Sequence, residues 1–147
     1  MRHRSVMGFI IMDVDHFKIY NDTYGHNRGD LVLSKIGQVM QEVFKRGGDH
    51  AFRLGGEEFG ALIETDTPKG VEQMAEQLRK AIIGLEIEHE GNEPHRIVTA
   101  SIGTSYRDFK SQPDFKIDSD LLYKNADAGL YRAKASGRNC VVPFEEE

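Results

Sequence analysis

The chain has 147 residues, a length that suits one domain with one core. Its net charge is −5 and it has no long basic block, so its charge argues against broad nucleic-acid binding. The single cysteine, Cys140, excludes a disulfide within the chain and favours a reducing cytoplasm, and no apolar stretch approaches the roughly 20 residues of a membrane helix.

The first half of the chain predicts a strand, a helix and a hairpin. Residues 7–12 are a continuous apolar run of strand length, typical of a buried central strand. Residues 30–44 carry apolar side chains at helical spacing, and the Gly-Gly pair after them is expected to end that helix. Residues 50–54 and 59–63 then flank a Gly-Gly-Glu-Glu tip as the two strands of a hairpin.

The second half predicts two more helices and two more strands. A Thr-Pro pair opens the first of these helices, because proline suits the first helical position. Cys140 lies in a short apolar run near the end of the chain and is predicted to be core. In order, the elements are a helix at 67–85, an alternating strand at 97–102, a polar connection at 104–118, a helix from Ser119 or a neighbour to Gly137, and a strand at 140–142.

This order of elements predicts an α+β fold. Strand, helix, strand, strand, helix, strand is the order of a ferredoxin-like split βαββαβ core, with a central antiparallel sheet flanked by helices. In that topology the first strand lies beside the third and runs antiparallel to it. Asp13, at the end of the first strand, and the adjacent Glu57 and Glu58, at the hairpin tip, are therefore expected at one edge of the sheet.

These carboxylates fit one of two settings. Glu57 and Glu58 on a tight glycine turn are costly unless something positive neutralises them or water solvates the turn. A divalent metal that carries a nucleoside triphosphate is one such partner, because magnesium keeps few protein ligands and takes the rest from phosphate and water. An aspartate here also suits the cap of a helix expected from Phe17, and we assign capping to Asp15 and metal binding to Asp13.

Polar residues after the first strand suit a bound nucleotide. Lys18 suits a phosphate, Asn21 offers a donor and an acceptor, and an ionised Asp30 accepts the paired N–H groups of guanine, which adenine lacks. The alternatives are a solvated lysine, helix caps at Asn21 and Asp30, and a structural role for His26.

Two basic residues lie at the end of the last predicted helix. Lys134 and Arg138 flank an Ala-Ser-Gly sequence that ends it. The helix dipole favours cations at that end, which is one explanation for both residues. The other explanation is a second clamp on a triphosphate.

Together these residues resemble the GGDEF family of diguanylate cyclases, over nearly the whole chain. Several motifs match in order and at the family's spacing, which is far more specific than a match of any one of them. They are Asp13-Val14-Asp15-His16-Phe17-Lys18, Asn21-Asp22, Gly25-His26, Gly29-Asp30, Gly55-Gly56-Glu57-Glu58-Phe59, Val98-Thr99-Ala100-Ser101-Ile102-Gly103 and Ala128-Gly129-Leu130-Tyr131-Arg132-Ala133-Lys134-Ala135-Ser136-Gly137-Arg138-Asn139. Glu57 replaces the family's common aspartate and keeps the carboxylate, so this variant is an accepted one.

The resemblance implies a reaction and a site. The family condenses two GTP molecules into cyclic di-GMP and releases two pyrophosphates, on a fold related to nucleotidyl cyclase and polymerase palm domains. Magnesium is the implied cofactor, with manganese as the alternative ion. Glu57 and Lys18 are the implied catalytic residues, Glu57 as a metal ligand or as the group that helps to deprotonate the 3′-hydroxyl. The other implied roles are metal binding by Asp13, the Val14 carbonyl and Glu58, phosphate contacts by Lys18, Lys134 and Arg138, guanine contacts by Asn21 and Asp30, and a place near the substrate for His26.

The resemblance also implies partners and regulation. One domain holds one GTP, so two domains must face each other in a homodimer with twofold (C2) symmetry. Arg46 and Asp49 match an Arg-x-x-Asp pattern that forms an inhibitory product site in the family. The family's usual lead-in helix is absent. The resemblance therefore implies a single GGDEF catalytic domain over residues 1–147 without a sensor domain, as a cytoplasmic fragment of a sensor-linked or membrane-linked protein.

Three other functions stay open. A non-catalytic module that binds GTP or cyclic di-GMP is the main alternative, but such relatives typically lose signature carboxylates, and Asp13, Glu57 and Glu58 are all present. A cyclase that makes a mixed purine dinucleotide is disfavoured by Asp30 at the guanine-reading position. A polymerase-palm-like nucleic-acid enzyme is disfavoured by the acidic balance and the small size of the chain.

Overall fold

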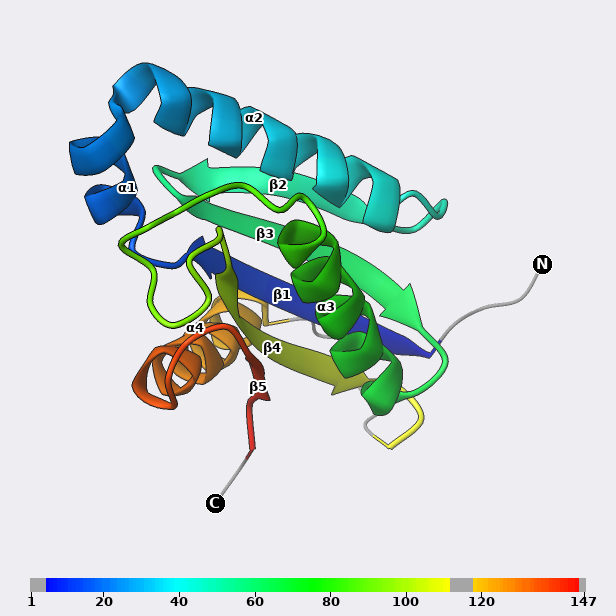
Figure 1. Ribbon diagram of the computed structural model, residues 1–147. Coiled ribbons are helices and arrows are strands. Elements are labelled where there is room, and N and C mark those ends of the chain that lie inside the picture. Colours follow the sequence, from blue (N-terminus) through cyan, green and yellow to red (C-terminus); the bar gives the residue numbers. More distant parts are fainter. Residues whose placement is uncertain (1–4, 112–117, 146–147) are drawn as a thin grey trace.

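A five-stranded sheet forms the centre of the computed structural model, which describes residues 5–111 and 118–145. The strands lie side by side in the order β2-β3-β1-β4-β5 (Figure 1). In chain order the elements are β1 (Val6–Val14), α1 (Phe17–Tyr24), α2 (His26–Val43), β2 (His50–Gly55), β3 (Glu58–Thr65), α3 (Pro68–Ile83), β4 (Ala100–Asp108), α4 (Ser119–Ala135) and β5 (Val141–Pro143).

The sheet has the pairing of the predicted split βαββαβ core. β1 lies in the middle and pairs antiparallel with both β3 and β4. β2 pairs antiparallel with β3 as a hairpin, and β5 adds to the far edge, parallel to β4. The predicted α+β, ferredoxin-like fold is therefore confirmed. Cys140, just before β5, is only half buried, so its prediction as core was wrong.

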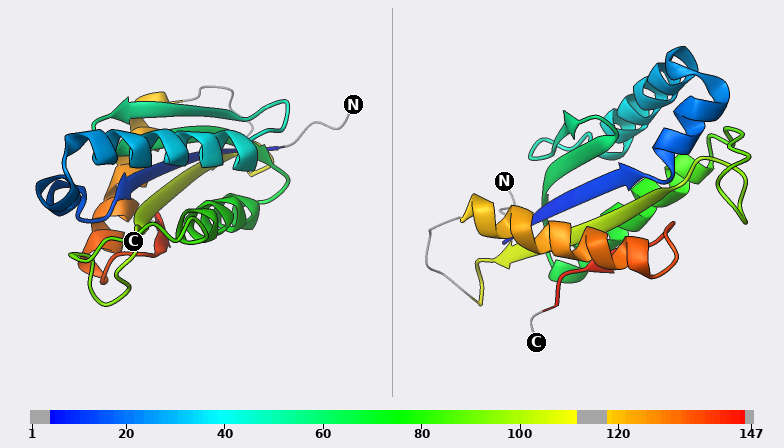
Figure 2. Two further views of the ribbon diagram at one scale, coloured as in Figure 1. Left: turned by 45° about the horizontal axis from the view of Figure 1, so that its top comes forward. Right: turned by 90° about the vertical axis from the view of Figure 1, so that its left-hand side faces the viewer.

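Alternation along β1 sends its side chains to two different layers. Ile10 and Met12 are fully buried in the layer that includes α2 and α3. Phe9 and Ile11 pack on the opposite side, against α4. Figure 2 shows α2 and α3 on one face of the sheet and α4 on the other. The same alternation places Asp13 on the α4 side.

α1 begins at Phe17 as predicted, whereas the start of α2 differs from the prediction. α2 begins at His26 rather than at residue 30, and Gly25 separates it from α1 with a φ of 93°. That conformation suits glycine and allows the chain to change direction between the helices. α2 then ends at Val43, before the glycine pair, and Phe44 leaves the helix to be buried in the core.

β4 differs more strongly from the prediction. The strand expected at residues 97–102 begins later and continues into the predicted polar connection. Thr104 and Ser105 are buried in that continuation, and Ser105 Oγ donates to the Leu122 carbonyl at 2.6 Å. Pairing along the whole of β1 satisfies the backbone, so a polar stretch forms a buried strand. Residues 112–117 of the predicted connection lie outside the described residues.

The starts of the later helices follow the predicted signals. Thr67 caps α3, where its hydroxyl accepts from the backbone N–H of Gly70 at 3.2 Å. Asp118, beside the predicted Ser119, caps α4 through Leu121 N at 3.0 Å. None of the helices in residues 5–111 and 118–145 is long and apolar enough to cross a membrane.

Candidate active site

The hairpin tip and the end of β1 lie side by side. Asp13 is the register partner of Glu58 across the β1–β3 ladder, and Val14 N donates to the Glu57 carbonyl at 3.3 Å. Gly56 turns the tip with a φ of 51°, a left-handed conformation that favours glycine. The predicted meeting of Asp13 with the glutamate pair at one edge of the sheet is therefore confirmed.

This edge concentrates buried negative charge. Asp13 is 8% exposed, and burial raises the pKa of its carboxyl above the ordinary value, with a further contribution from Glu57. Lys134 Nζ lies 2.7 Å from Asp13 Oδ2 and lowers that pKa in part. Burial, and then the charge of Asp13, raise the pKa of the half-buried Glu58. A cation bound here would remove the like-charge repulsion.

The oxygen atoms at this edge suit a hard divalent ion such as magnesium. The carboxylates of Asp13 and Glu58 lie on paired strand positions, and the Val14 carbonyl follows directly. Within the described ranges, no group of three or more His, Cys, Asp or Glu side chains is arranged to hold a metal ion by itself. An ion at this edge would need further ligands from phosphate and water. The ligand set of Asp13, Val14, Glu57 and Glu58 stays a prediction.

Two adjoining pockets at this edge share Phe17, Lys18 and Glu57. The larger pocket has a volume of about 480 Å³ and opens between α1, α2 and the hairpin tip. The smaller pocket, of about 180 Å³, lies between the end of β1 and the end of α4. The structure thus brings together every residue predicted to bind the substrate: Asn21, His26 and Asp30 line the larger pocket, and Lys134 and Arg138 line the smaller one.

Asn21 and Asp30 do not cap helices, so that alternative is wrong for both. Asn21 lies inside α1 and Asp30 inside α2. Asn21 Oδ1 is buried and has no hydrogen-bond partner among the described residues. Gly29 makes room for it, because a Cβ at that position would lie only 1.8 Å from Asn21 Oδ1. The amide oxygen thus packs against Gly29.

Asp15 does not cap α1, which corrects the prediction. His16 is the N-cap residue, with a φ of 52° and no side-chain hydrogen bond to the helix. The Asp15 carboxylate instead accepts from Thr99 Oγ1, just before β4, at 2.7 Å and from Ser101 Oγ, in β4, at 2.5 Å. The capping prediction failed because this distant segment offers two hydroxyl donors that the local sequence around Asp15 does not display.

Arg53 also belongs to the site, although no motif in the sequence singled it out. Its side chain lines the larger pocket, and its Nε donates to the Gly56 carbonyl at 2.9 Å. This contact holds the turn that carries Glu57. The sequence does carry a signal for this role, an arginine two positions before the Gly-Gly pair. An arginine at that point of β2 lies beside the turn and can contact it.

The predicted Arg-x-x-Asp pair is formed, at a different place on the molecule. Arg46 Nε lies 3.1 Å from Asp49 Oδ2, and Arg46 Nη2 donates to the Glu64 carbonyl at 3.0 Å. Arg46 also lines a pocket of about 330 Å³ at the start of α3, which has no lining residue in common with the two pockets above. A ligand there would be separate from a ligand at the carboxylates.

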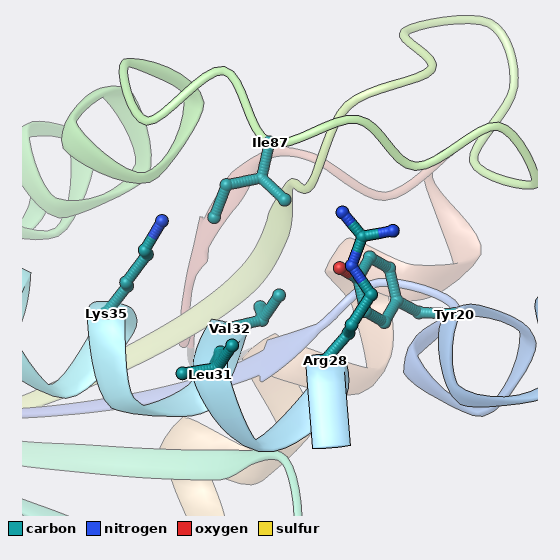
Figure 3. Close-up of a pocket in the computed structure, with 6 residues that line it drawn as sticks. All are labelled: Tyr20, Arg28, Leu31, Val32, Lys35 and Ile87. Atoms are coloured by element: carbon teal, nitrogen blue, oxygen red, sulfur yellow. The ribbon is translucent and has the colours of Figure 1, made fainter. Parts of the chain in front are cut away.

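A further pocket lies beside α2 and carries no predicted residue (Figure 3). Its volume is about 130 Å³, and Val32 and Ile87 give it apolar walls. Among the residues that the structure describes, Arg28 and Lys35 are the charged ones that line it, and no carboxylate does. It therefore lacks the oxygen ligands that a metal–nucleotide site requires.

The sequence matches a known family over most of its length. Residues 1–140 match the family described as diguanylate cyclase, GGDEF domain. Among curated proteins, diguanylate cyclase A of Treponema denticola is 33% identical over 139 residues, and diguanylate cyclase DgcS of Shewanella oneidensis is 34% identical over 140 residues. Each alignment covers 95% of this chain but only 35% and 43% of the respective relative, so the chain spans less than half of their length.

Solved structures show the same fold. The GGDEF domain of DgcB from Caulobacter crescentus, in complex with c-di-GMP, has a TM-score of 0.80 at 30% identity, covering 96% of this chain and 79% of that one. The active GGEEF domain of a diguanylate cyclase from Vibrio cholerae has a TM-score of 0.78 at 29% identity, covering 97% and 85%. From the family match and the curated relatives, this chain belongs to the GGDEF-domain family of diguanylate cyclases.

Proposed function

We propose that this chain condenses two GTP molecules into cyclic di-GMP and two pyrophosphates. The observation that carries the proposal is the carboxylate edge, Asp13 opposite Glu58, beside two pockets of different chemistry. The larger pocket offers hydrogen-bonding groups for a base, Asn21 and Asp30, and the smaller one offers cations for phosphates, among them Lys134. A nucleoside triphosphate with a divalent ion uses all three features.

The larger pocket suits guanine. Its volume of about 480 Å³ is within the range of pockets that hold small molecules. Guanine presents N1–H and a 2-amino group on one edge, and the exposed carboxylate of Asp30 accepts both. Asn21 lines the same pocket, where its amide can contact the base. His26 lies exposed at the rim, where it contacts a bound nucleotide.

The smaller pocket suits the triphosphate. Lys18, Lys134 and Arg138 supply three positive side chains to its lining, enough to offset much of the phosphate charge. Magnesium held by the carboxylate edge and the Val14 carbonyl would supply further charge neutralisation there. By binding the β- and γ-phosphates, the basic side chains orient the α-phosphorus for attack, which is the main contribution that protein groups make to phosphoryl transfer.

Glu57 lies where the reaction must occur, because it lines both pockets. The 3′-oxygen of one GTP attacks the α-phosphorus of the other, and the bond from that phosphorus to the bridging oxygen breaks. Pyrophosphate leaves, and the hydroxyl proton passes to a base. Glu57 is placed to accept this proton or to serve as a metal ligand. A second step with the two nucleotides exchanged closes the ring.

The same geometry requires two copies of the domain. One larger pocket and one smaller pocket hold one GTP, and a symmetric product needs two nucleotides in head-to-tail contact. Two copies related by a twofold axis bring each 3′-hydroxyl to the α-phosphorus bound by the other copy. We therefore propose that turnover depends on a homodimer and rises more steeply than in proportion to protein concentration.

We also propose product inhibition at the separate pocket beside Arg46. The guanidinium of Arg46 lines that pocket and is fixed by Asp49. Arginine binds phosphate or the Hoogsteen edge of guanine through two parallel hydrogen bonds, and cyclic di-GMP offers both groups. Because this pocket shares no residue with the catalytic pockets, product bound there acts without occupying the GTP site.

The test is incubation with GTP and magnesium, followed by chromatography of the products. The chain is expected to form cyclic di-GMP and pyrophosphate in a ratio of one to two. Glu57→Gln should abolish the product, and Glu42→Gln, an exposed glutamate of α2, should leave it unchanged. GTP binding without product at any protein concentration would instead support a receptor module.

A further inference from the structure

The turn that carries Arg138 has an uncommon backbone. Gly137, Arg138 and Asn139 have φ angles of 106°, 65° and 46°, so three consecutive residues have positive φ. Glycine adopts such angles readily, but two successive non-glycine residues hold them only where neighbouring contacts fix the chain. The contacts that fix this turn therefore determine where the Arg138 side chain points.

Asn139 has three polar contacts. Its backbone N–H donates to Asp15 Oδ2 at 3.1 Å, its side-chain Oδ1 accepts from Arg79 Nη1 at 2.9 Å, and its Nδ2 lies 3.3 Å from His95 Nε2. Arg79 is itself fixed on α3 by Glu76, whose Oε2 accepts from Arg79 Nε at 2.9 Å. The turn after α4 is thus tied both to the end of β1 and to α3.

Asp15 uses its carboxylate for this structural purpose. It is 2% exposed and accepts from Thr99 Oγ1 and Ser101 Oγ in addition to the Asn139 N–H. A carboxylate buried this deeply is retained where hydrogen bonds satisfy it. Asp15 therefore joins β1, β4 and the turn at one point.

Arg138 takes its direction from these contacts. Its backbone N–H donates to the Ala133 carbonyl at 3.0 Å, and its side chain lines the smaller pocket together with Lys134. Within residues 5–111 and 118–145, its guanidinium donates to the Lys134 carbonyl at 3.4 Å, a long contact. The other guanidinium N–H groups are then available to phosphate oxygens.

We propose that Asp15, Asn139 and Arg79 are positioning residues that hold Arg138 toward the triphosphate. This inference rests on the proposed function, because it needs a triphosphate in the smaller pocket. Arg79 lies on α3 and lines neither of the two catalytic pockets. Its effect on nucleotide binding must therefore pass through Asn139 and the turn.

A double-mutant cycle tests the proposal by binding rather than by turnover. Isothermal titration calorimetry with magnesium measures the Kd of GMP and of a GTP analogue with a non-hydrolysable bridge between the α- and β-phosphates. Arg138→Ala should weaken the analogue about tenfold and leave GMP unchanged. Arg79→Ala should weaken the analogue about three- to tenfold, also without effect on GMP, and the double variant should bind like Arg138→Ala alone.

Three further variants separate positioning from general stability. Asn139→Gly keeps a residue that tolerates positive φ but removes the Oδ1 acceptor and the contact of Nδ2 with His95, so it should weaken the analogue at least as much as Arg79→Ala. Arg79→Lys still donates to Asn139 and should restore part of the affinity. Lys80→Ala, an exposed change on the same helix, should alter neither Kd. Thermal unfolding of each variant confirms that binding is measured on folded protein.

Two results would overturn this inference alone. The first is that Arg79→Ala and Asn139→Gly weaken the binding of GMP as much as the binding of the analogue. The second is that the separate losses of analogue affinity in Arg79→Ala and Arg138→Ala multiply in the double variant. A wild-type chain that binds the analogue no better than GMP would overturn the proposed function as well, because no triphosphate contact would then exist for Arg138 to make. The outcomes are distinguishable because the wild-type measurement comes first.

Discussion

Replacing Asp13 by asparagine should abolish turnover without destabilising the fold. Burial raises the pKa of the Asp13 carboxyl, the charge of Glu57 adds to that, and Lys134 offsets only part of it. The Lys134 side chain is 37% exposed, so solvent screens its ion pair with Asp13. The pair therefore stabilises the fold by about 1 kcal/mol, less than a fully buried charged hydrogen bond would. The net shift of the Asp13 pKa is upward. Removing the charge therefore relieves a burial cost that is larger than the stabilisation lost with the Lys134 ion pair.

The sign follows from proton linkage. A raised carboxyl pKa means that the folded chain binds this proton more tightly than the unfolded chain, so the free energy of unfolding falls as pH rises from the ordinary value of 3.8 through the raised one. Above the raised pKa, Asp13 is charged in both states and carries the whole penalty. Asparagine carries none, so the free energy of unfolding should change by 0 to about +1 kcal/mol, which raises Tm by 0 to about 4 °C.

Thermal unfolding by circular dichroism in EDTA measures this change, and product chromatography with magnesium measures the lost activity. As the matched comparison, wild-type Tm should rise as pH falls from neutrality toward the pKa of Asp13, and Asp13→Asn should show less of that rise. Magnesium with a GTP analogue should raise Tm for the wild type only. A Tm for Asp13→Asn more than about 3 °C below wild type in EDTA would refute the reasoning, because the carboxylate would then be a net stabilising group.

Three further predictions concern other parts of the molecule. Arg46→Ala should relieve inhibition by added cyclic di-GMP while turnover stays near wild type, and unchanged inhibition in a steady-state assay would count against that site. Gly29→Ala places a Cβ 1.8 Å from Asn21 Oδ1 and should weaken GMP binding about tenfold in calorimetry. Gly37→Ala, on the same helix with nothing within 4 Å of the added Cβ, is the control and should instead raise the free energy of unfolding by about 0.5–1 kcal/mol. Burial lowers the pKa of His89 below its ordinary 6.5, so protonation favours the unfolded chain, and the free energy of unfolding falls as pH drops below 6.5. In urea unfolding measured against pH, His89→Gln should flatten this fall. An unchanged slope would assign the fall to another group.

Topology made the centre of the site predictable. The order of the elements implied that β1 lies beside β3, and this pairing brings Asp13 opposite Glu58 although the two are far apart in sequence. Apolar runs and glycine turns are strong signals, so the sheet followed from them. The start of α3 was equally well specified, because Thr67 and a proline at the first helical position act locally.

Features set by distant partners were not predictable in the same way. Asp15 was expected to cap a helix, because its neighbours in sequence suggest only that use, and the hydroxyls of Thr99 and Ser101 reach it only once β4 pairs with β1. The buried polar stretch around Ser105 was expected to be a connection for a similar reason, since its acceptor is a carbonyl of α4. Local composition cannot display such hydrogen bonds, which exist only between elements.

Lys134 shows how the fold maintains a cluster of acids before any ion is bound. Because side chains alternate along β1, Asp13 lies on the face that α4 covers, and the ammonium of Lys134 stands 2.7 Å from it. A divalent ion bound to Asp13 would take over this neutralisation, and the half-exposed lysine would then be free to contact phosphate. A shift of one residue in the β1 register would move Asp13 to the α2 and α3 face and separate it from Lys134. The buried pattern of β1 thus fixes the register, and through the register it fixes which cation meets the Asp13 carboxylate.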